Sequence, residues 1–401
     1  MKRAVTVTYI LIVLLATTAF QNLAVVEGEK QDETKVLTII KKFVIWIRDN
    51  IDYKVHGLLP YYPNETYAKG EGDCDDQANL FITLCRIYGI PAFLQVGCIY
   101  LSTQRMNETF WEGHVTLVYE RIGWHGWAVV YVPPWGWLPF DFTYVISGLD
   151  DPLDAMKQAA VVAFQEVIQY ANITKTDYVA SYKETKDFLR ENYFYVYERN
   201  EMTQEVSQGD FVSFVIQVTR TFSNSGTGKK IWNLTAEERT INLFMNNTWQ
   251  TVQLINSSVP LENMTVDEDG NPIAFLQLPQ SELKPGENVS YAVTYRALSK
   301  PRSLPNITQN ESKTLEEIPK DLKANYTGAA GPWLVNNQEL QGLAHNIAQN
   351  GKEIVDNTSK WVLVATVVTI VAVVGLFLYV RKLKRETKRS YLPSEEPSSL
   401  T

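Results

Sequence analysis

Cysteine and histidine are scarce in this chain, with three cysteines and four histidines among 401 residues. The motifs C-x-x-C, H-x-x-H and H-E-x-x-H, which place metal ligands close together, do not occur. We therefore expect neither a metal nor a cofactor. Three cysteines cannot all pair within one chain, so at least one thiol stays free or bonds another molecule.

Positive charge is also in short supply. Lysine and arginine number 37 against 45 aspartates and glutamates, which gives a formal net charge of -8. No basic stripe appears before the extreme C-terminus, so nucleic acid is not an expected partner. The remaining composition, 45% hydrophobic and 20% charged, is ordinary for a globular protein, and the length predicts about two domains with additional segments.

Long apolar runs occur only near the two ends of the chain. Residues 1–27 begin with a short basic head and continue apolar, which predicts a signal peptide or an N-terminal anchor. Residues 361–380 carry no charge over a length that suits a transmembrane helix. The basic stretch RKLKRETKR follows, so we expect a cytoplasmic tail at 381–401 and an extracytoplasmic location for everything between the two runs.

The distribution of glycosylation sequons agrees with an exported chain. Twelve of the 25 asparagines stand in N-x-S/T, and all twelve precede the predicted span. The candidate sites are Asn64, Asn107, Asn172, Asn233, Asn246, Asn256, Asn263, Asn288, Asn306, Asn310, Asn325 and Asn357. The expected location is the cell membrane, in a glycoprotein held by a single C-terminal span.

Hydrophobic periodicity divides the exported part into regions. Residues 30–200 mix helical spacing with two-residue alternation, which predicts an α+β core with a helical extension at 151–171 and 177–190. Residues 205–298 contain short strands separated by turns, which predicts an immunoglobulin-like β-sandwich. Residues 299–360 read as a linker followed by a juxtamembrane helix.

Cys74 opens one of the predicted helices, directly after Asp73, a favourable N-cap residue. Cys85 lies 11 residues further along the same helix, roughly 16 Å away at 1.5 Å per residue. A disulfide requires Cα atoms within about 7 Å, so these two cannot bond. Cys85 can instead meet Cys98 on the next strand, or both can be buried free thiols.

A thiol at a helix N-terminus has a lowered pKa, but the acids that flank Cys74 oppose this effect. A histidine base, and an acid to orient it, are therefore required. His125 opens one predicted strand and Asp141 closes the next. A tight turn centred on Pro133 would place the two side chains about 5 Å apart. His114, which also begins a strand, is the rival base.

These residues resemble the transglutaminase-like superfamily, in its membrane-anchored archaeal or bacterial form. The matching motifs are G-x-C-x-D-x-A, G-I-P-A, H-x-W and G-W-x-P-x-D. Their positions here are Gly72, Cys74, Asp76, Ala78, Gly89 to Ala92, His125, Trp127, Gly136, Trp137, Pro139 and Asp141.

The resemblance implies a papain-like core with Cys74 as the nucleophile, His125 as the base and Asp141 as the orienting acid. It further implies attack on the amide bonds of proteins or peptides at the cell envelope through a thioester, ending in hydrolysis or acyl transfer. Trp127 and Trp137 are the candidate substrate-binding residues. The alternative function is a non-catalytic adhesion or assembly module built on the same fold.

Overall fold

The computed structural model describes residues 35–143, 151–207 and 209–350, all within one compact unit, Glu33–Lys352. The predicted signal segment 1–27, the predicted span 361–380, the tail 381–401 and the sequon at Asn357 lie outside the described residues. None of the helices formed by described residues combines the length and the apolar character that crossing a bilayer requires.

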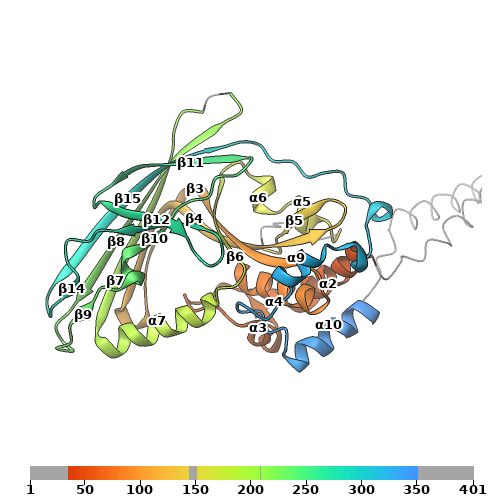
Figure 1. The fold of residues 1–401 in the computed structure, drawn as a ribbon, viewed down its shortest axis with the longest axis horizontal. Helices are drawn as coiled ribbons and strands as arrows, with labels where there is room; N and C mark the ends of the chain where they lie inside the picture. Colours follow the sequence, from red (N-terminus) through yellow and green to blue (C-terminus); the bar gives the residue numbers. More distant parts are fainter. Residues whose placement is uncertain (1–34, 144–150, 208, 351–401) are drawn as a thin grey trace, which may run out of the picture. The chain divides into compact units, whose positions relative to one another are not determined.

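Short and long helices are interspersed with strands along the chain (Figure 1). The helices are α2 (Val36–Asn50), α3 (Pro63–Lys69), α4 (Cys74–Ile87), η1 (Trp111–Gly113), α5 (Asp154–Lys157), α6 (Ala160–Ala163), α7 (Tyr178–Asn192), α8 (Ala236–Arg239), η2 (Gln309–Glu311), η3 (Leu315–Glu317), α9 (Lys320–Tyr326) and α10 (Gln338–Asn350). The strands are β1 (Asp52–Tyr53), β2 (Glu71–Gly72), β3 (Ala92–Phe110), β4 (Val115–Val132), β5 (Gly136–Phe140), β6 (Val167–Ile173), β7 (Phe194–Gln204), β8 (Val212–Asn224), β9 (Trp232–Asn233), β10 (Thr240–Asn242), β11 (Gln250–Ser257), β12 (Leu261–Val266), β13 (Pro272–Leu276), β14 (Glu282–Leu283) and β15 (Asn288–Ser299).

One curled sheet organises the fold (Figure 1). Its strand order is β11-β15-β8-β7-β4-β3-β6, and β5 pairs with β4 beside this path. Neighbours in the sheet are antiparallel except β4 and β7, which are parallel. The predicted mixed α+β class is confirmed, and the sheet is compatible with the core that the resemblance implied.

The apolar faces of α2 and α4 pack together against one face of β3 and β4. Both helices carry apolar residues at intervals of three and four, as predicted. Phe43 of α2 and Phe81 of α4 are completely buried in this cluster, together with Leu94 of β3 and Val130 of β4. This packing fixes the start of α4, and therefore Cys74, relative to β4.

The strands of residues 205–298 are arranged differently from the predicted separate β-sandwich. β8, β15 and β11 continue the same sheet that contains β3 and β4, because β7 pairs with β4 along one edge and with β8 along the other. A small sheet, β10-β13-β12, packs against this extension, with Ala274 of β13 buried beside Tyr295 of β15. The described residues of this region therefore form no independent immunoglobulin-like domain.

The predicted helical extension is only partly correct. The second helix is present as α7, whereas residues 151–171 form the short helices α5 and α6 and then enter strand β6. β6 pairs antiparallel with β3, with Cys98 opposite Ile168. Val167, Ile168 and Ala171 are buried there. The spacing of these apolar residues fits a helical face as well as a strand. The segment forms a strand because it can pair with the edge of β3.

The predicted linker after residue 299 packs back on the core. We call residues 300–337, between β15 and α10, the strap. Ile318 and Trp333 are buried, and Trp333 stacks on the guanidinium of Arg86 at 3.7 Å. Arg86, on α4, donates hydrogen bonds to the carbonyls of Gly328 and Ala330. The strap is therefore bonded to the helix that carries Cys74.

The helix that follows the strap, α10, belongs to the same core. Leu340, Ala344 and Ile347 are buried with residues of α2 and α4. Lys42 of α2 donates to the carbonyl of Ala348 at 2.7 Å. The predicted helix near residue 340 is therefore present within the described residues, and it packs on the core.

Candidate active site

Cys74 is the first residue of α4, and the helix start presses closely on β4. A Cβ atom added at Gly126 would lie 3.2 Å from Cβ of Asp75, so glycine allows this approach. The backbone N–H of Gly126 donates a hydrogen bond to the sulfur of Cys74. The half-buried thiol is thus held beside the residue that follows His125.

The electrostatic surroundings of Cys74 favour the protonated thiol. Burial raises its pKa well above the ordinary value, and the charges of Asp75 and Asp73 act in the same direction. The hydrogen bond from Gly126 acts in the opposite direction. The thiol lies 3.9 Å from Oδ1 of Asp75. A neutral thiol of this kind needs a separate base to become a nucleophile.

His125 and Asp141 form the contact that the sequence predicted. The imidazole Nε2 lies 2.7 Å from Oδ2 of Asp141, and the two side chains are 8% and 1% exposed. A carboxylate accepts this bond, so Nε2 carries the proton and Nδ1 is the nitrogen that can act as a base.

The Asp141 carboxylate is held by further donors. The N–H of Ala160 donates to Oδ2, and the N–H and hydroxyl of Thr143 donate to Oδ1, each at 3.1 Å. Burial alone would raise the pKa of Asp141, but the charge of His125 and these hydrogen bonds lower it below the ordinary value. Asp141 is therefore an ionised, fixed acceptor.

The register of the hairpin differs from the one assumed for this contact. β4 pairs with β5 so that Val132 faces Gly136 and Ala128 faces Phe140. The turn is thus centred on Pro134, one residue beyond the predicted centre. His125 and Asp141 are therefore diagonal neighbours across the strand pair, and their side chains are long enough to bridge that separation.

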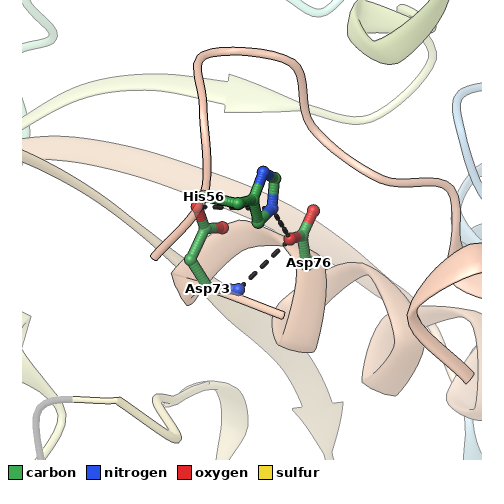
Figure 2. Close-up of side chains that lie close together, drawn as sticks. All are labelled: His56, Asp73 and Asp76. Carbon is green, nitrogen blue, oxygen red and sulfur yellow. Dashed lines mark hydrogen bonds and ion pairs between the residues drawn. The ribbon is translucent and has the colours of Figure 1, made fainter. Parts of the chain in front are cut away.

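A second histidine lies at the same helix start and was not predicted as a site residue. Nε2 of His56 is 2.5 Å from Oδ2 of Asp76 and 3.6 Å from Asp73 (Figure 2). Oδ2 of Asp76 also accepts from the N–H of Asp73, and Oδ1 accepts from the N–H of Tyr61. The fully buried Asp76 thereby ties the loop before α3 to the first turn of α4.

The same groups offer ligands that could hold a cation. His56, Asp73 and Asp76 place one ligand atom each within 4.8 Å of one another, and so do Asp73, Cys74 and Asp75. Asp76 already accepts hydrogen bonds from three donors. We therefore assign His56, Asp73 and Asp76 the role of holding the loop before α3 against the start of α4. The motif G-x-C-x-D marks Asp76, but no local signal marks His56, which lies 20 residues away.

Asp75 is held by a second network that the sequence did not reveal. Its Oδ2 accepts from the hydroxyl of Tyr178, at the start of α7, at 2.6 Å. The Tyr178 oxygen in turn accepts from Asn79 at 2.6 Å. α7 is thereby fastened to the helix that carries the thiol.

The rival base His114 is not near the thiol. It directly precedes β4, more than about 30 Å along the strand from His125 at the usual rise per residue. His125 itself lies inside β4 and does not open a strand as predicted. Its Nδ1 bonds to the carbonyl of Phe194 at 2.7 Å, and its ring stacks on Tyr195. Its role is to join β4 to β7.

The two candidate substrate-binding tryptophans are placed differently from that prediction. Trp127 is completely buried, donates to Oε1 of Gln95 and lies 5.8 Å from the His125 ring. It shields the imidazole and presents no surface to a substrate. Trp137 faces Tyr131 of β4, six residues from His125, which is roughly 20 Å along the strand.

The Cys85–Cys98 disulfide, one of the two arrangements left open by the sequence, is not formed, because all three cysteines are free. Cys85 is buried in the cluster between α4 and the sheet, whereas Cys98 is buried in the cluster on the other face. The sheet separates the two, and the alternative of two buried thiols is the correct one.

One of three comparisons with known proteins found a match. Residues 23–142 match the family model of the Transglutaminase-like superfamily. Cys74, His125 and Asp141 all fall within that range. No curated protein and no solved structure matches the chain.

Proposed function

We propose, from the premise that residues 23–142 are a transglutaminase-like superfamily domain, that this chain is a cysteine enzyme acting on amide bonds of proteins or peptides. The observation that carries the proposal is the buried hydrogen bond between His125 and Asp141, beside the helix start that holds Cys74. The three residue types are those of a thiol triad.

The proposed reaction starts from the neutral thiol. Nδ1 of His125 takes the proton from Cys74 as the sulfur attacks the carboxamide carbon, and Asp141 stabilises the resulting imidazolium. The tetrahedral intermediate collapses, the C–N bond breaks, and the leaving nitrogen takes the proton back from the imidazolium. A thioester on Cys74 remains. Attack by water releases an acid, and attack by an amine forms a new amide.

Hydrolysis is the outcome that we favour over cross-linking. Water is abundant outside a cell, and no feature of the sequence marks a site for an acceptor amine. The expected substrates are proteins or peptides near the cell envelope.

The proposed setting is the outer face of a membrane, with residues 1–27 directing export and residues 361–380 anchoring the chain. The exposure of the sequons supports this setting. Of the eleven sequon asparagines that the structure describes, nine are exposed, and Asn64 and Asn172 are half-buried. Oδ1 of the Asn172 side chain accepts from Gln95 and Gln169, so the half-buried amide that would carry a glycan is held within the fold, and we expect no glycan there.

Mass spectrometry of the purified exported part, incubated with a glutamine peptide and a primary amine, tests the activity. Amine addition identifies a transferase, conversion of the amide to an acid identifies a deamidase, and chain cleavage identifies a protease. Cys74→Ala should abolish every product. The matched control Cys85→Ala removes a buried thiol and should retain them.

Two results would reject the proposal. One is a product that survives Cys74→Ala. The other is a wild-type protein that modifies neither the peptide nor a mixture of envelope proteins, which would favour the adhesion module.

A further inference from the structure

Tyr53 is held next to the nucleophile by a short parallel ladder. β1 pairs with β2 so that Tyr53 stands opposite Gly72, two residues before Cys74. The N–H of Asp52 donates to Gly70, and that of Lys54 donates to Gly72 at 3.0 Å. The backbone on both sides of Tyr53 is therefore bonded to the chain that leads into α4.

The segment after Tyr53 is fixed to the same helix by Asp76. This carboxylate accepts from the imidazole of His56 and from the N–H of Tyr61, while it also holds the N–H of Asp73 (Figure 2). Residues on both sides of the loop are thus tied to the turn that carries Cys74. A group presented from this segment keeps a defined position relative to the thiol.

The Tyr53 side chain contributes little to the packing of the core. It is 53% exposed and belongs to none of the three hydrophobic clusters that the described residues form. The charges that act on its hydroxyl are those of the site. Partial burial raises the pKa of Tyr53 to about 12, with the charges of Cys74, Asp73, Asp141 and Asp75 adding in that order. The hydroxyl is consequently a proton donor across the neutral range.

The reaction proposed above needs such a donor. When sulfur attacks the carboxamide, the carbonyl oxygen becomes negatively charged. Asp75, whose carboxylate lies 3.9 Å from the Cys74 sulfur, would repel that charge. Asp73 adds none at neutral pH, because burial and the charge of Asp75 raise the pKa of Asp73 to about 10. Fixed N–H or O–H donors directed at the oxygen offset this repulsion. The N–H of Cys74 is one of the first in α4, where no intrahelical acceptor exists, and it can supply one bond.

We propose that Tyr53 is a further catalytic residue, and that its hydroxyl and the N–H of Cys74 together bind the oxyanion formed during attack. The inference rests on the proposed amide chemistry of Cys74. The Tyr53 proton is shared with the oxygen and is not transferred. It stays on the phenol when the carbonyl re-forms and the C–N bond breaks.

Tyr53→Phe tests the proposal through two reactions of the same thiol. Turnover of the glutamine peptide should lose about 10²- to 10³-fold in kcat with little change in KM, as when one oxyanion donor is removed. Alkylation of Cys74 by iodoacetamide should keep its rate, because displacement of iodide from a CH₂ group builds no oxyanion. Tyr197→Phe is the control, since Tyr197 lies on β7 opposite Thr116, 37% exposed.

Unchanged kcat in Tyr53→Phe would overturn the inference and leave the proposed function intact. An equal loss in turnover and alkylation would also overturn it, because Tyr53 would then act on the thiol. An inactive wild type would reject both proposals together. The far-ultraviolet circular dichroism of the variant should match the wild type, which excludes a folding defect.

Discussion

Asp75→Asn should make Cys74 more reactive as a nucleophile toward a simple alkylating agent. The Asp75 carboxylate lies 3.9 Å from the Cys74 sulfur, and its charge is the leading neighbour effect that raises the pKa of the thiol. Asparagine keeps the shape of the side chain and an oxygen that can accept from Tyr178. The substitution therefore removes mainly the charge.

The distance sets the size of the effect. Two unit charges 3.9 Å apart interact by about 1 kcal/mol in water and by about 4 kcal/mol at an effective dielectric constant near 20. The half-buried site lies between these limits. Even the lower figure raises the thiolate fraction about six-fold at a pH below the thiol pKa. Since a more acidic thiol is also a weaker nucleophile, the net rate gain is at least about 2- to 3-fold.

The assay is the pH dependence of iodoacetamide alkylation at Cys74, followed by mass spectrometry in a Cys85→Ala, Cys98→Ala background. Glu262→Gln, on the exposed strand β12, removes the same charge elsewhere and should leave the profile unchanged. A profile that does not move in Asp75→Asn, or that moves to higher pH, would refute the electrostatic reasoning.

Two further substitutions test the site and its support. Asp141→Asn should reduce amide turnover about 10³- to 10⁴-fold. The pKa of Asp141 is lowered in the folded protein, so the ionised carboxylate stabilises the fold at a pH above its ordinary pKa of 3.8, and this stabilisation is lost as the pH falls below that value. The free energy of unfolding, measured by urea titration, should therefore change less between neutral pH and about pH 3 in the variant than in the wild type. Leu340 is fully buried on α10, so Leu340→Ala leaves a cavity and should lower the free energy of unfolding by about 2–5 kcal/mol. The control is Glu339→Ala at the exposed neighbouring position, which should change the free energy of unfolding by less than about 0.5 kcal/mol in the same titration.

The local parts of the site could be predicted from the sequence. Apolar spacing identified α4, and the acids around Cys74 placed the thiol at its first turn. The tight turn before Asp141 brought this residue near His125. Each of these inferences depends on contacts within a helix or a hairpin, where sequence separation fixes the geometry to within a few ångströms.

The remaining features depend on contacts between distant segments. His56 meets Asp76 only because the β1–β2 ladder folds the intervening loop back, and neither residue signals this on its own. β6 carries an apolar pattern that fits a helix equally well. The motif marks Trp137, but the strand register, which the motif does not give, decides that it faces Tyr131.

The strap likewise could not be recognised from composition. Its proline and polar residues are typical of a linker, and its anchors, Trp333 and the carbonyls bonded to Arg86, are few and widely spaced. The buried Ile318 and the bonds of Ser312 and Lys313 to α2 add to this hold, and none of them is marked by composition.

The bond between Lys42 and the last turn of α10 has a mechanical consequence. Lys42 lies in the second turn of α2 and Ala348 in the last turn of α10, so the bond joins a helix near the start of the compact unit Glu33–Lys352 to a helix near its end. Tension between residues 35 and 350 would load the α2–α10 contact together with the antiparallel bridge between Lys35 and Thr314. Because α4 packs against both helices, such a load would pass directly to the helix that carries Cys74.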